Sequence, residues 1–248
     1  IATFRDRDPL VEQVVWGLHI EGPFMSPVPG YIGAHPVDHA CRADRSKAQR
    51  LIDASQGLAK IFTLAPERDP DGDVTEWLTE QGLIVSAGHT DCTLDQLHCA
   101  IDHGLRMVTH LGNGCPMLMH RHDNIIQRFL SMSERLWFSL IADGAHVPWH
   151  AFQNYVRQIT LDRACVVSDA ISAAGLGPGT FTLGAQRVEI GADLVPWAPD
   201  RSHFVGSATT MARAKDNLKD QGYSMADVRQ LTHDTPRRIL DGALPTDR

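Results

Sequence analysis

The strongest constraint on the fold of this chain is a regular alternation of short apolar runs with segments that carry helix signals. Six runs have the length and composition of buried strands: residues 14–20, 59–64, 82–88, 106–110, 137–142 and 164–168. Helix starts lie between them at Asp44, at Asp73 with Glu76, and at Thr93 with Gln96, where Gly104 ends the helix. Strands and helices at this spacing form parallel βαβ units, which predicts an α/β protein. Such units fit either a barrel or a doubly wound sheet.

Ionisable residues follow these runs where each strand is expected to end. They are His19 and Glu21 in the first run, then His89, His110, Asp143 with His146, and finally Asp169. In a barrel the carboxyl ends of all strands meet on one face, whereas in an open sheet only strands beside a switch point meet. Because five of the six runs end in this way, the pattern favours a TIM-like (β/α) barrel.

Glu21, His89 and His110 are the residues expected to bind a metal. A carboxylate and two neutral imidazoles suffice to hold a catalytic Zn²⁺ or Fe²⁺ that keeps one position open for water. A single His or Asp at a strand end is more often a helix cap or a satisfied polar residue, but the coincidence at five strands weakens that explanation. His19 is expected to pack in or beside the barrel wall. The sequence therefore predicts one divalent transition metal.

The composition indicates one domain and excludes several classes of partner. With 248 residues, 43% of them hydrophobic, the chain can bury one large core, and we expect a single domain over residues 1–248. A formal net charge of -7 offers no footprint for nucleic acid or an anionic membrane. No apolar run approaches the roughly 20 residues of a membrane span and no signal-peptide pattern opens the chain, so a cytoplasmic location is expected. The five scattered cysteines argue against disulfides and a thiolate zinc site.

The pattern changes after Asp169. Residues 181–190 alternate between apolar and polar side chains and are expected to form a small hairpin. Ser207 is expected to cap a helix that Gly222 ends, and a last helix is expected to begin at Ser224.

Short segments along the chain occur in an order that resembles the signatures of one enzyme family. They are GLHIEGPF at 17–24, GAH at 33–35, SAGHTD at 86–91, THLGNG at 109–114, ADGAHV at 142–147, SDA at 168–170 and GSATTM at 206–211. Together they resemble the N-acetylglucosamine-6-phosphate deacetylases of the amidohydrolase superfamily, from about Gly17 to Leu240. The resemblance implies a barrel of the metal-dependent hydrolase type that converts N-acetylglucosamine 6-phosphate to glucosamine 6-phosphate and acetate.

The resemblance also implies roles for the residues around the metal. The three predicted metal ligands match the metal ligands of the family, and Asp169 matches its catalytic acid/base. His146 would contact the substrate amide and stabilise the developing oxyanion, and His35 would contact a sugar hydroxyl.

The phosphate group of the substrate would be held on another segment. By resemblance, Asn113 and the Gly114 amide contact it, and Arg121 reaches it across the interface of a homodimer. From the residues alone, Arg121 fits equally well as a solvated loop residue between His120 and His122.

Two departures from the family border the expected sugar and phosphate sites. Gly112 and the Gly114-Cys115 pair replace an aromatic residue and an Ala-Met pair, and the loop between Glu21 and His35 is slightly longer. These departures keep open an amidohydrolase that acts on another N-acyl sugar phosphate or on an N-acyl amino acid. A further alternative is a metal-free barrel protein without catalytic activity, because a fold alone does not establish turnover.

The number of strands predicts an incomplete barrel. Closure of this barrel type takes eight strands, and by resemblance the strand that bears Glu21 is the third. We therefore expect the chain to lack the first two strands and the flanking β-sandwich of the family. A second metal ion cannot be assessed, because its ligands would lie on the first strand. The edges at 14–20 and 164–168 would be unpaired, which predicts insoluble or molten material for this span alone.

Overall fold

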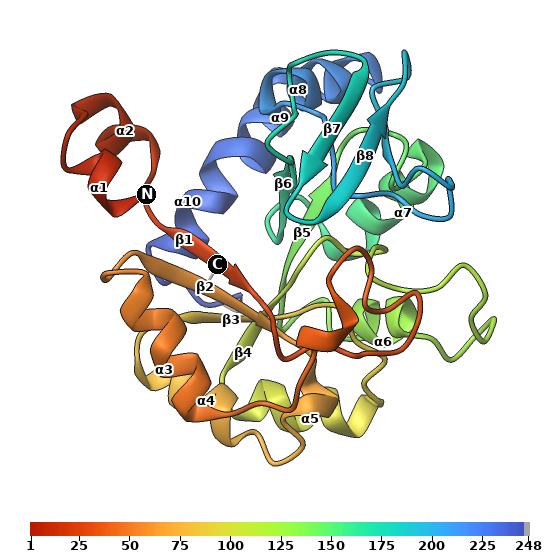
Figure 1. Ribbon diagram of the computed structural model, residues 1–248. Coiled ribbons are helices and arrows are strands. Elements are labelled where there is room, and N and C mark those ends of the chain that lie inside the picture. The colour runs from red at the N-terminus through yellow and green to blue at the C-terminus, as the bar shows by residue number, and fades with distance from the viewer. Residues whose placement is uncertain (246–248) are drawn as a thin grey trace.

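The computed structural model describes residues 1–245 and contains the predicted parallel sheet. Six strands pair in the order β1-β2-β3-β4-β5-β6, each parallel to its neighbour. They are β1 (Leu18–Glu21), β2 (Ala59–Leu64), β3 (Ile84–Ala87), β4 (Leu105–Val108), β5 (Trp137–Ile141) and β6 (Ala164–Val167). The sheet curls into a half barrel (Figure 1). The α/β prediction is thus confirmed in a coarser form, as a curled parallel sheet of six strands.

The first strand is shorter than predicted. Residues 14–17 lie outside β1, because helix α2 (Pro9–Val14) occupies the preceding part of the chain. Asp8 caps this helix by accepting a hydrogen bond from the Leu10 amide at 2.9 Å. Helix α1 (Ala2–Arg5) comes before it, and neither helix contains a buried residue. Both project from the body at the left of Figure 1.

Helices connect successive strands and cover the convex face of the sheet. They are α3 (Arg45–Ala54), α4 (Asp73–Glu80), α5 (Leu94–Asp102), α6 (Ile125–Ser131) and α7 (Trp149–Ile159), with 3-10 turns η1 (Val37–His39) and η2 (Pro66–Arg68). The predicted caps at Asp44 and Thr93 are confirmed, the second as a complete capping box. Helix α4 differs, because Asp73 is its first residue and the buried Asp69 carboxylate accepts from the amides of Val74 and Thr75.

The concave face of the sheet changes from apolar to polar along the strands. Because alternate residues of a strand point to one side, an apolar layer forms from Ile61, Ile84, Met107, Trp137 and Cys165. Two residues further along four of these strands lie the hydroxyl side chains of Thr63, Ser86, Thr109 and Ser139. The Thr63 and Ser86 hydroxyls each lie 2.7 Å from the Thr109 hydroxyl. The predicted site residues follow at the ends of the strands, above this hydroxyl layer.

A second, antiparallel sheet follows β6. The predicted hairpin is formed by β7 (Gly179–Leu183) and β8 (Gln186–Ile190), and β9 (Pro196–Trp197) adds a third strand. This sheet has its own small core, which includes Val188 and Ile190. Gln186 Nε2 donates to the Ala34 carbonyl at 2.7 Å, so the hairpin is tied to the loop after β1.

Four helical segments complete the described chain. They are α8 (Met211–Asp220), α9 (Met225–Arg229), a π-helical turn η3 (Gln230–Asp234) and α10 (Thr235–Leu240). The prediction that Ser207 caps α8 was wrong, because Ser207 pairs with Ala170 in a β-bridge and Thr210 provides the cap. The cap at Ser224 is confirmed.

Strands β1 and β6 form the two edges of the main sheet. Helix α10 contacts residues in or near both of these edge strands. Ile239 packs with Trp137 and Cys165, and the Arg237 guanidinium lies 5.3 Å from the ring centroid of Trp16. It remains a prediction that this chain lacks two further strands and the β-sandwich of the family. The insolubility of this span alone also remains a prediction.

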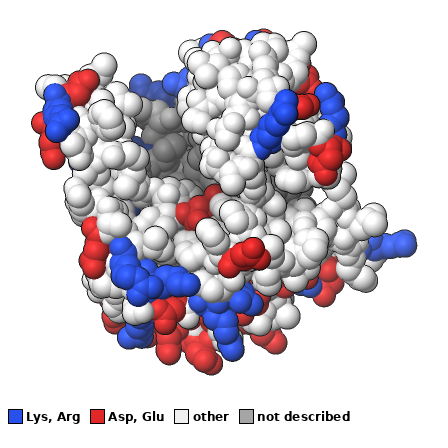
Figure 2. All heavy atoms as spheres, viewed as in Figure 1, with Lys and Arg blue, Asp and Glu red and all other residues white. Residues whose placement is uncertain are grey.

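The described residues add three observations, on the helices, the cysteines and the surface. No helix within residues 1–245 is both long and apolar enough to cross a bilayer. All five cysteines are unpaired. On the face drawn in Figure 2, acidic and basic side chains are mixed, and the surface is hollowed between the N-terminal helices and the second sheet.

Candidate active site

The three predicted metal ligands meet at the carboxyl ends of β1, β3 and β4. Glu21 Oε1 lies 2.9 Å from His110 Nε2 and 3.3 Å from His89 Nε2. The two imidazole nitrogens are 3.1 Å apart. In a tetrahedral site, metal–ligand bonds of about 2.0–2.2 Å separate neighbouring ligand atoms by about 3.3–3.6 Å. The three atoms are therefore spaced nearly as a shared metal ion would require.

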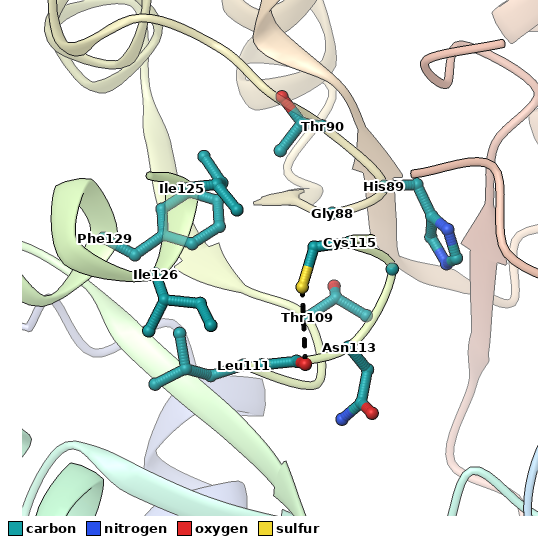
Figure 3. Close-up of a pocket in the computed structure, with 12 residues that line it drawn as sticks. Gly88, His89, Thr90, Thr109, Leu111, Asn113, Cys115, Ile125, Ile126 and Phe129 are labelled. Atoms are coloured by element: carbon teal, nitrogen blue, oxygen red, sulfur yellow. Dashed lines mark hydrogen bonds between the residues drawn. The ribbon is translucent and has the colours of Figure 1, made fainter. Parts of the chain in front are cut away.

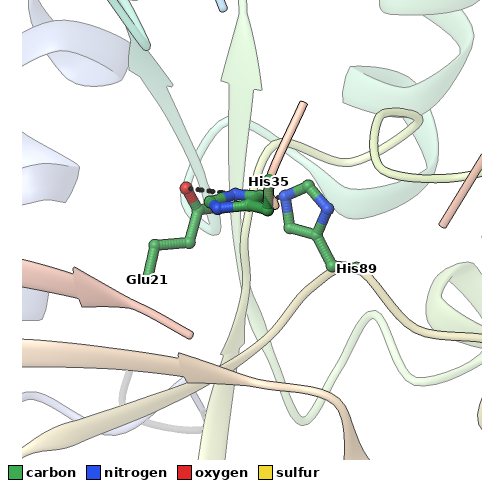
Figure 4. A group of neighbouring side chains, drawn as sticks. All are labelled: Glu21, His35 and His89. Atoms are coloured by element: carbon green, nitrogen blue, oxygen red, sulfur yellow. Dashed lines mark ion pairs between the residues drawn. The ribbon is translucent and has the colours of Figure 1, made fainter. Parts of the chain in front are cut away.

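His35 joins this cluster from the loop after β1. Its Nε2 lies 3.5 Å from Glu21 Oε2, and its ring centroid is 4.6 Å from that of His89. Glu21, His35 and His89 each offer a ligand atom within 4.8 Å of the others, as Figure 4 shows. His35, for which the resemblance implied a sugar contact, thus also lies within reach of a cation held by Glu21.

The His89 ring is held in one orientation from two sides. Its Nδ1 lies 2.8 Å from the Tyr31 carbonyl, which can only accept a hydrogen bond, so Nδ1 carries the proton and Nε2 keeps a free lone pair. Metal-binding histidines in proteins typically donate in this way. A Cβ atom at Gly33 or Gly114 would lie 3.0 Å or less from this ring, and both glycines have positive φ. Tyr31 was not found from the sequence, because a carbonyl contact leaves no signal in residue type.

Three candidate site residues adopt a left-handed backbone where their strands end. His89, His110 and Asp169 have φ angles of 53°, 34° and 49°. A non-glycine residue in this region costs about 1–3 kcal/mol, and such residues cluster at functional sites. The strain therefore marks the same strand ends that the ionisable residues mark in the sequence.

The electrostatics of the cluster favour the ionised form of Glu21, and this negative charge needs a positive partner. Burial raises the pKa of Glu21, but the contacts with the His110, His35 and His89 side chains outweigh it and hold that pKa well below its usual range. Burial lowers the pKa of His89, whereas for His110 the contact with Glu21 raises the pKa in spite of burial. The negative charge of the partly buried Glu21 can be balanced either by a proton on His110 or by a bound cation.

His146 forms a separate pair with Asp143 at the end of β5. His146 Nδ1 lies 2.6 Å from Asp143 Oδ2, and both side chains are almost fully buried. Asp143 Oδ1 also accepts from the amides of Ala145 and His146 at 2.9 Å each. Burial raises the pKa of Asp143, but these hydrogen bonds outweigh it and lower the pKa. Because Asp143 occupies Nδ1, the ring of His146 has Nε2 left for a substrate. The strand-end position of Asp143 was the signal for this partner.

Asp169 lies at the end of β6 with its side chain exposed. Its carbonyl accepts from the Ser207 amide at 2.9 Å, which fixes its backbone. Burial lowers the pKa of His19, and the Asp169 charge opposes that shift; the same charge helps Glu21 to raise the pKa of His110 in spite of burial. His19 Nε2 lies 2.6 Å from the Thr63 hydroxyl, but the residue is exposed in this sheet, so its packing in the barrel wall remains a prediction.

The segment expected to hold a phosphate lies beside His89. Asn113 Nδ2 donates to the His110 carbonyl at 3.2 Å. Asn113 and Gly114 line a small cavity of about 10 Å³, drawn in Figure 3, together with His89. A space of this size holds about one water molecule. Arg121 is exposed on the following loop, and among the described residues it contacts none of these groups through a hydrogen bond or ion pair.

Known proteins resemble the chain in sequence and in structure. The N-acetylglucosamine-6-phosphate deacetylase of Lysinibacillus sphaericus is 32% identical over 211 residues, which cover 84% of this chain and 52% of that protein. The N-acetylgalactosamine-6-phosphate deacetylase of Escherichia coli O157:H7 is 30% identical over 233 residues, 93% of this chain and 60% of that protein. No family model matches the chain.

A solved structure agrees with these relatives. A mutant N-acetyl-D-glucosamine-6-phosphate deacetylase from Mycobacterium smegmatis, in complex with N-acetyl-D-glucosamine-6-phosphate, superposes with a TM-score of 0.84 at 25% identity. The match covers 95% of this chain and 65% of that one. The chain spans about half the length of the curated relatives it matches. By sequence and by fold, the chain belongs to the family of N-acetylglucosamine-6-phosphate deacetylases.

Proposed function

We propose that this chain is the catalytic core of a metal-dependent deacetylase that hydrolyses N-acetylglucosamine 6-phosphate to glucosamine 6-phosphate and acetate. The observation that carries the proposal is the convergence of Glu21, His89 and His110 within 2.9–3.3 Å of one another at three strand ends. The names of the relatives support the substrate class. A non-catalytic barrel protein would have no need for this partly buried charge or for strained backbone at His89 and His110.

Glu21, His89 and His110 would hold one divalent transition metal, zinc or iron, with His35 beside it. When bound, such an ion activates water at neutral pH and polarises a carbonyl group. The donor set fits this task, because the carboxylate is ionised and His89 presents a free Nε2.

Asp169 and His146 would carry out the proton transfer and the charge stabilisation. Asp169 takes a proton from the water that attacks the amide carbon and returns it to the amine as the C–N bond breaks. His146 contacts the carbonyl oxygen, where negative charge develops, and Asp143 holds its ring in place. The acyl carbon gains the hydroxyl group of water and leaves as acetate.

The substrate would be positioned by residues around this centre. His35 would contact a sugar hydroxyl, and Asn113 with the Gly114 amide would contact the phosphate. Arg121 would reach the phosphate from the second subunit of a homodimer, and its exposed position suits such a role. The enzyme would act in the cytoplasm.

A deacetylation screen tests this function. Purified protein loaded with Zn²⁺ or Fe²⁺ is assayed for acetate release from N-acetylglucosamine and N-acetylgalactosamine, each with and without a 6-phosphate, and from an N-acetyl amino acid. We expect turnover of N-acetylglucosamine 6-phosphate above all others. Preference for the galactosamine epimer would move the assignment to the substrate named for the Escherichia coli relative. No acetate release from any substrate would contradict the proposal.

Replacing Arg121 with alanine should weaken binding of the phosphate group. A guanidinium contacts phosphate through two parallel hydrogen bonds, and charged hydrogen bonds of this kind contribute about 1.5–3 kcal/mol. We therefore expect KM for the 6-phosphorylated substrate to rise about 10- to 100-fold, with little change for the dephosphorylated analogue. An equal effect on both substrates in steady-state kinetics would instead identify Arg121 as a solvated loop residue.

A further inference from the structure

Glu67, on the turn η2 that follows β2, binds the two residues that come directly after His89. The Thr90 hydroxyl donates to Glu67 Oε2, and the Asp91 amide donates to Glu67 Oε1 at 3.0 Å. The same Thr90 oxygen accepts from the Cys92 amide at 3.0 Å. Thr90 is buried, and in Figure 3 its hydroxyl points away from the cavity beside His89. One carboxylate thus holds the start of the segment that leads away from a predicted metal ligand.

The backbone of His89 has a conformation that needs support from its surroundings. Its φ angle of 53° lies in the left-handed region, where a residue with a Cβ atom is strained. Such strain persists only where the surrounding structure fixes the chain. The His89 carbonyl accepts from the Ser26 amide at 3.0 Å, and Glu67 binds the next two residues. Without Glu67, the peptide after His89 would be free to relax and to turn the imidazole away from the cluster.

Glu67 is itself fixed by the turn on which it lies. Pro66 is buried and restricts the backbone directly before Glu67. The Ala65 amide donates to the Phe24 carbonyl at 2.7 Å, and the Arg68 amide closes the turn by donating to the Ala65 carbonyl at 2.8 Å. The carboxylate is therefore presented to the segment after His89 from a rigid support.

The charge of Glu67 is not explained by an ion pair. Among the described residues it has no ion-pair partner, and burial raises its pKa although the contacts with Thr90 and Asp91 oppose the shift. Taking a carboxylate partly out of water without a cation costs free energy. The carboxylate therefore serves as an acceptor for the segment after His89, not as one half of a salt bridge.

We propose that Glu67 is a positioning residue that holds His89 in its strained conformation, so that Nε2 lies within the metal-ligand cluster before an ion binds. The inference rests on the proposed function, of which the metal site is a part, and deepens it by naming the group that preorganises one ligand. Glu67 does for the backbone of His89 what the Tyr31 carbonyl does for its ring. Removing a partner that orients a metal ligand typically lowers metal affinity about 10- to 100-fold.

The test is the Zn²⁺ affinity of the purified, metal-free protein, measured by titration calorimetry. We expect Glu67→Ala to weaken Zn²⁺ binding about 10- to 100-fold. Glu67→Gln should recover most of this loss, because its amide can still accept from the Asp91 amide and donate to the Thr90 oxygen. Glu67→Asp keeps the charge but is too short to reach both groups, so it should behave like Glu67→Ala. Glu80→Ala, which removes an exposed carboxylate of α4, should stay within about twofold of the wild type.

A double-variant comparison separates positioning from general stability. Arg128, on helix α6, donates to Asp91 Oδ1 at 3.0 Å, so the segment after His89 keeps a second support when Glu67 is replaced. All variants should therefore unfold cooperatively without metal. In a His89→Ala background, Glu67→Ala should cause no further loss of Zn²⁺ affinity, because the ligand that it positions is gone.

The outcomes distinguish this proposal from the proposed function. Equal Zn²⁺ affinities of the wild type and Glu67→Ala would overturn the positioning role. So would a loss in Glu67→Gln as large as that in Glu67→Ala, or a further loss in the His89→Ala background. A wild type that binds Zn²⁺ but releases no acetate would contradict the proposed deacetylation alone, because the affinities do not depend on turnover. A wild type that binds no Zn²⁺ would overturn both.

Discussion

Asp169→Asn should retain the fold and most of the substrate affinity but lose nearly all turnover. Asparagine has almost the same shape as aspartate but cannot accept a proton from water and return it to an amine. Proton transfer by a positioned side chain contributes about 10²- to 10⁴-fold to a rate, so kcat should fall by about that factor while KM changes little. Because the Asp169 carbonyl, not its carboxylate, bonds to Ser207, the strand end should keep its conformation.

Steady-state kinetics with the 6-phosphorylated substrate measure this effect. Asp162→Asn is the matched control, because Asp162 is an exposed carboxylate shortly before the same strand. That variant should behave as the wild type does. Thermal unfolding of both variants should match the wild type and so exclude a loss of fold. A kcat for Asp169→Asn close to the wild-type value would rule out the acid/base role.

The main sheet was predictable because local sequence and tertiary structure agree there. Each strand of this sheet overlaps a short apolar run, five of the six runs end in or precede an ionisable residue, and the helix caps at Asp44 and Thr93 lie where the residue types indicated. The errors occurred where tertiary contacts override local preference. Residues 14–17 are apolar enough for a strand, but Val14 is the last residue of helix α2 and the other three follow that helix. Ser207 is a good cap that instead pairs with Ala170.

The residue types of the candidate site were predictable from the sequence. The groups that hold these residues in their orientations were not. The meeting of Glu21, His89 and His110 follows from parallel strands whose ends share one side of a sheet. The partners that orient them come from distant segments and include main-chain atoms, as with the Tyr31 carbonyl on His89. No spacing in the sequence encodes such contacts.

Removal of a metal ligand should have the other large effect. We expect Glu21→Gln and His110→Asn to lose bound metal and, with it, measurable deacetylation. Changes to groups that merely support metal ligands already lower affinity about 10- to 100-fold, so loss of a direct ligand should exceed 100-fold. Elemental analysis after dialysis measures the metal content. His150→Asn is the matched control, because His150 is exposed on helix α7, away from the cluster, and should leave the metal content unchanged.

Thermal unfolding gives an independent measure of the same ligand set. A metal that binds only the folded protein stabilises it by about 2.7 kcal/mol at one hundred times its dissociation constant. For a chain of this size that free energy corresponds to a rise in Tm of about 5–10 °C. Adding Zn²⁺ should therefore raise the Tm of the wild type and of His150→Asn but not that of Glu21→Gln or His110→Asn. Full metal occupancy together with an unchanged Tm response in both ligand variants would show that the ion is held by other residues. A loss in Glu21→Gln alone would replace His110 with His35, whose Nε2 lies 3.5 Å from the same carboxylate, as the third ligand.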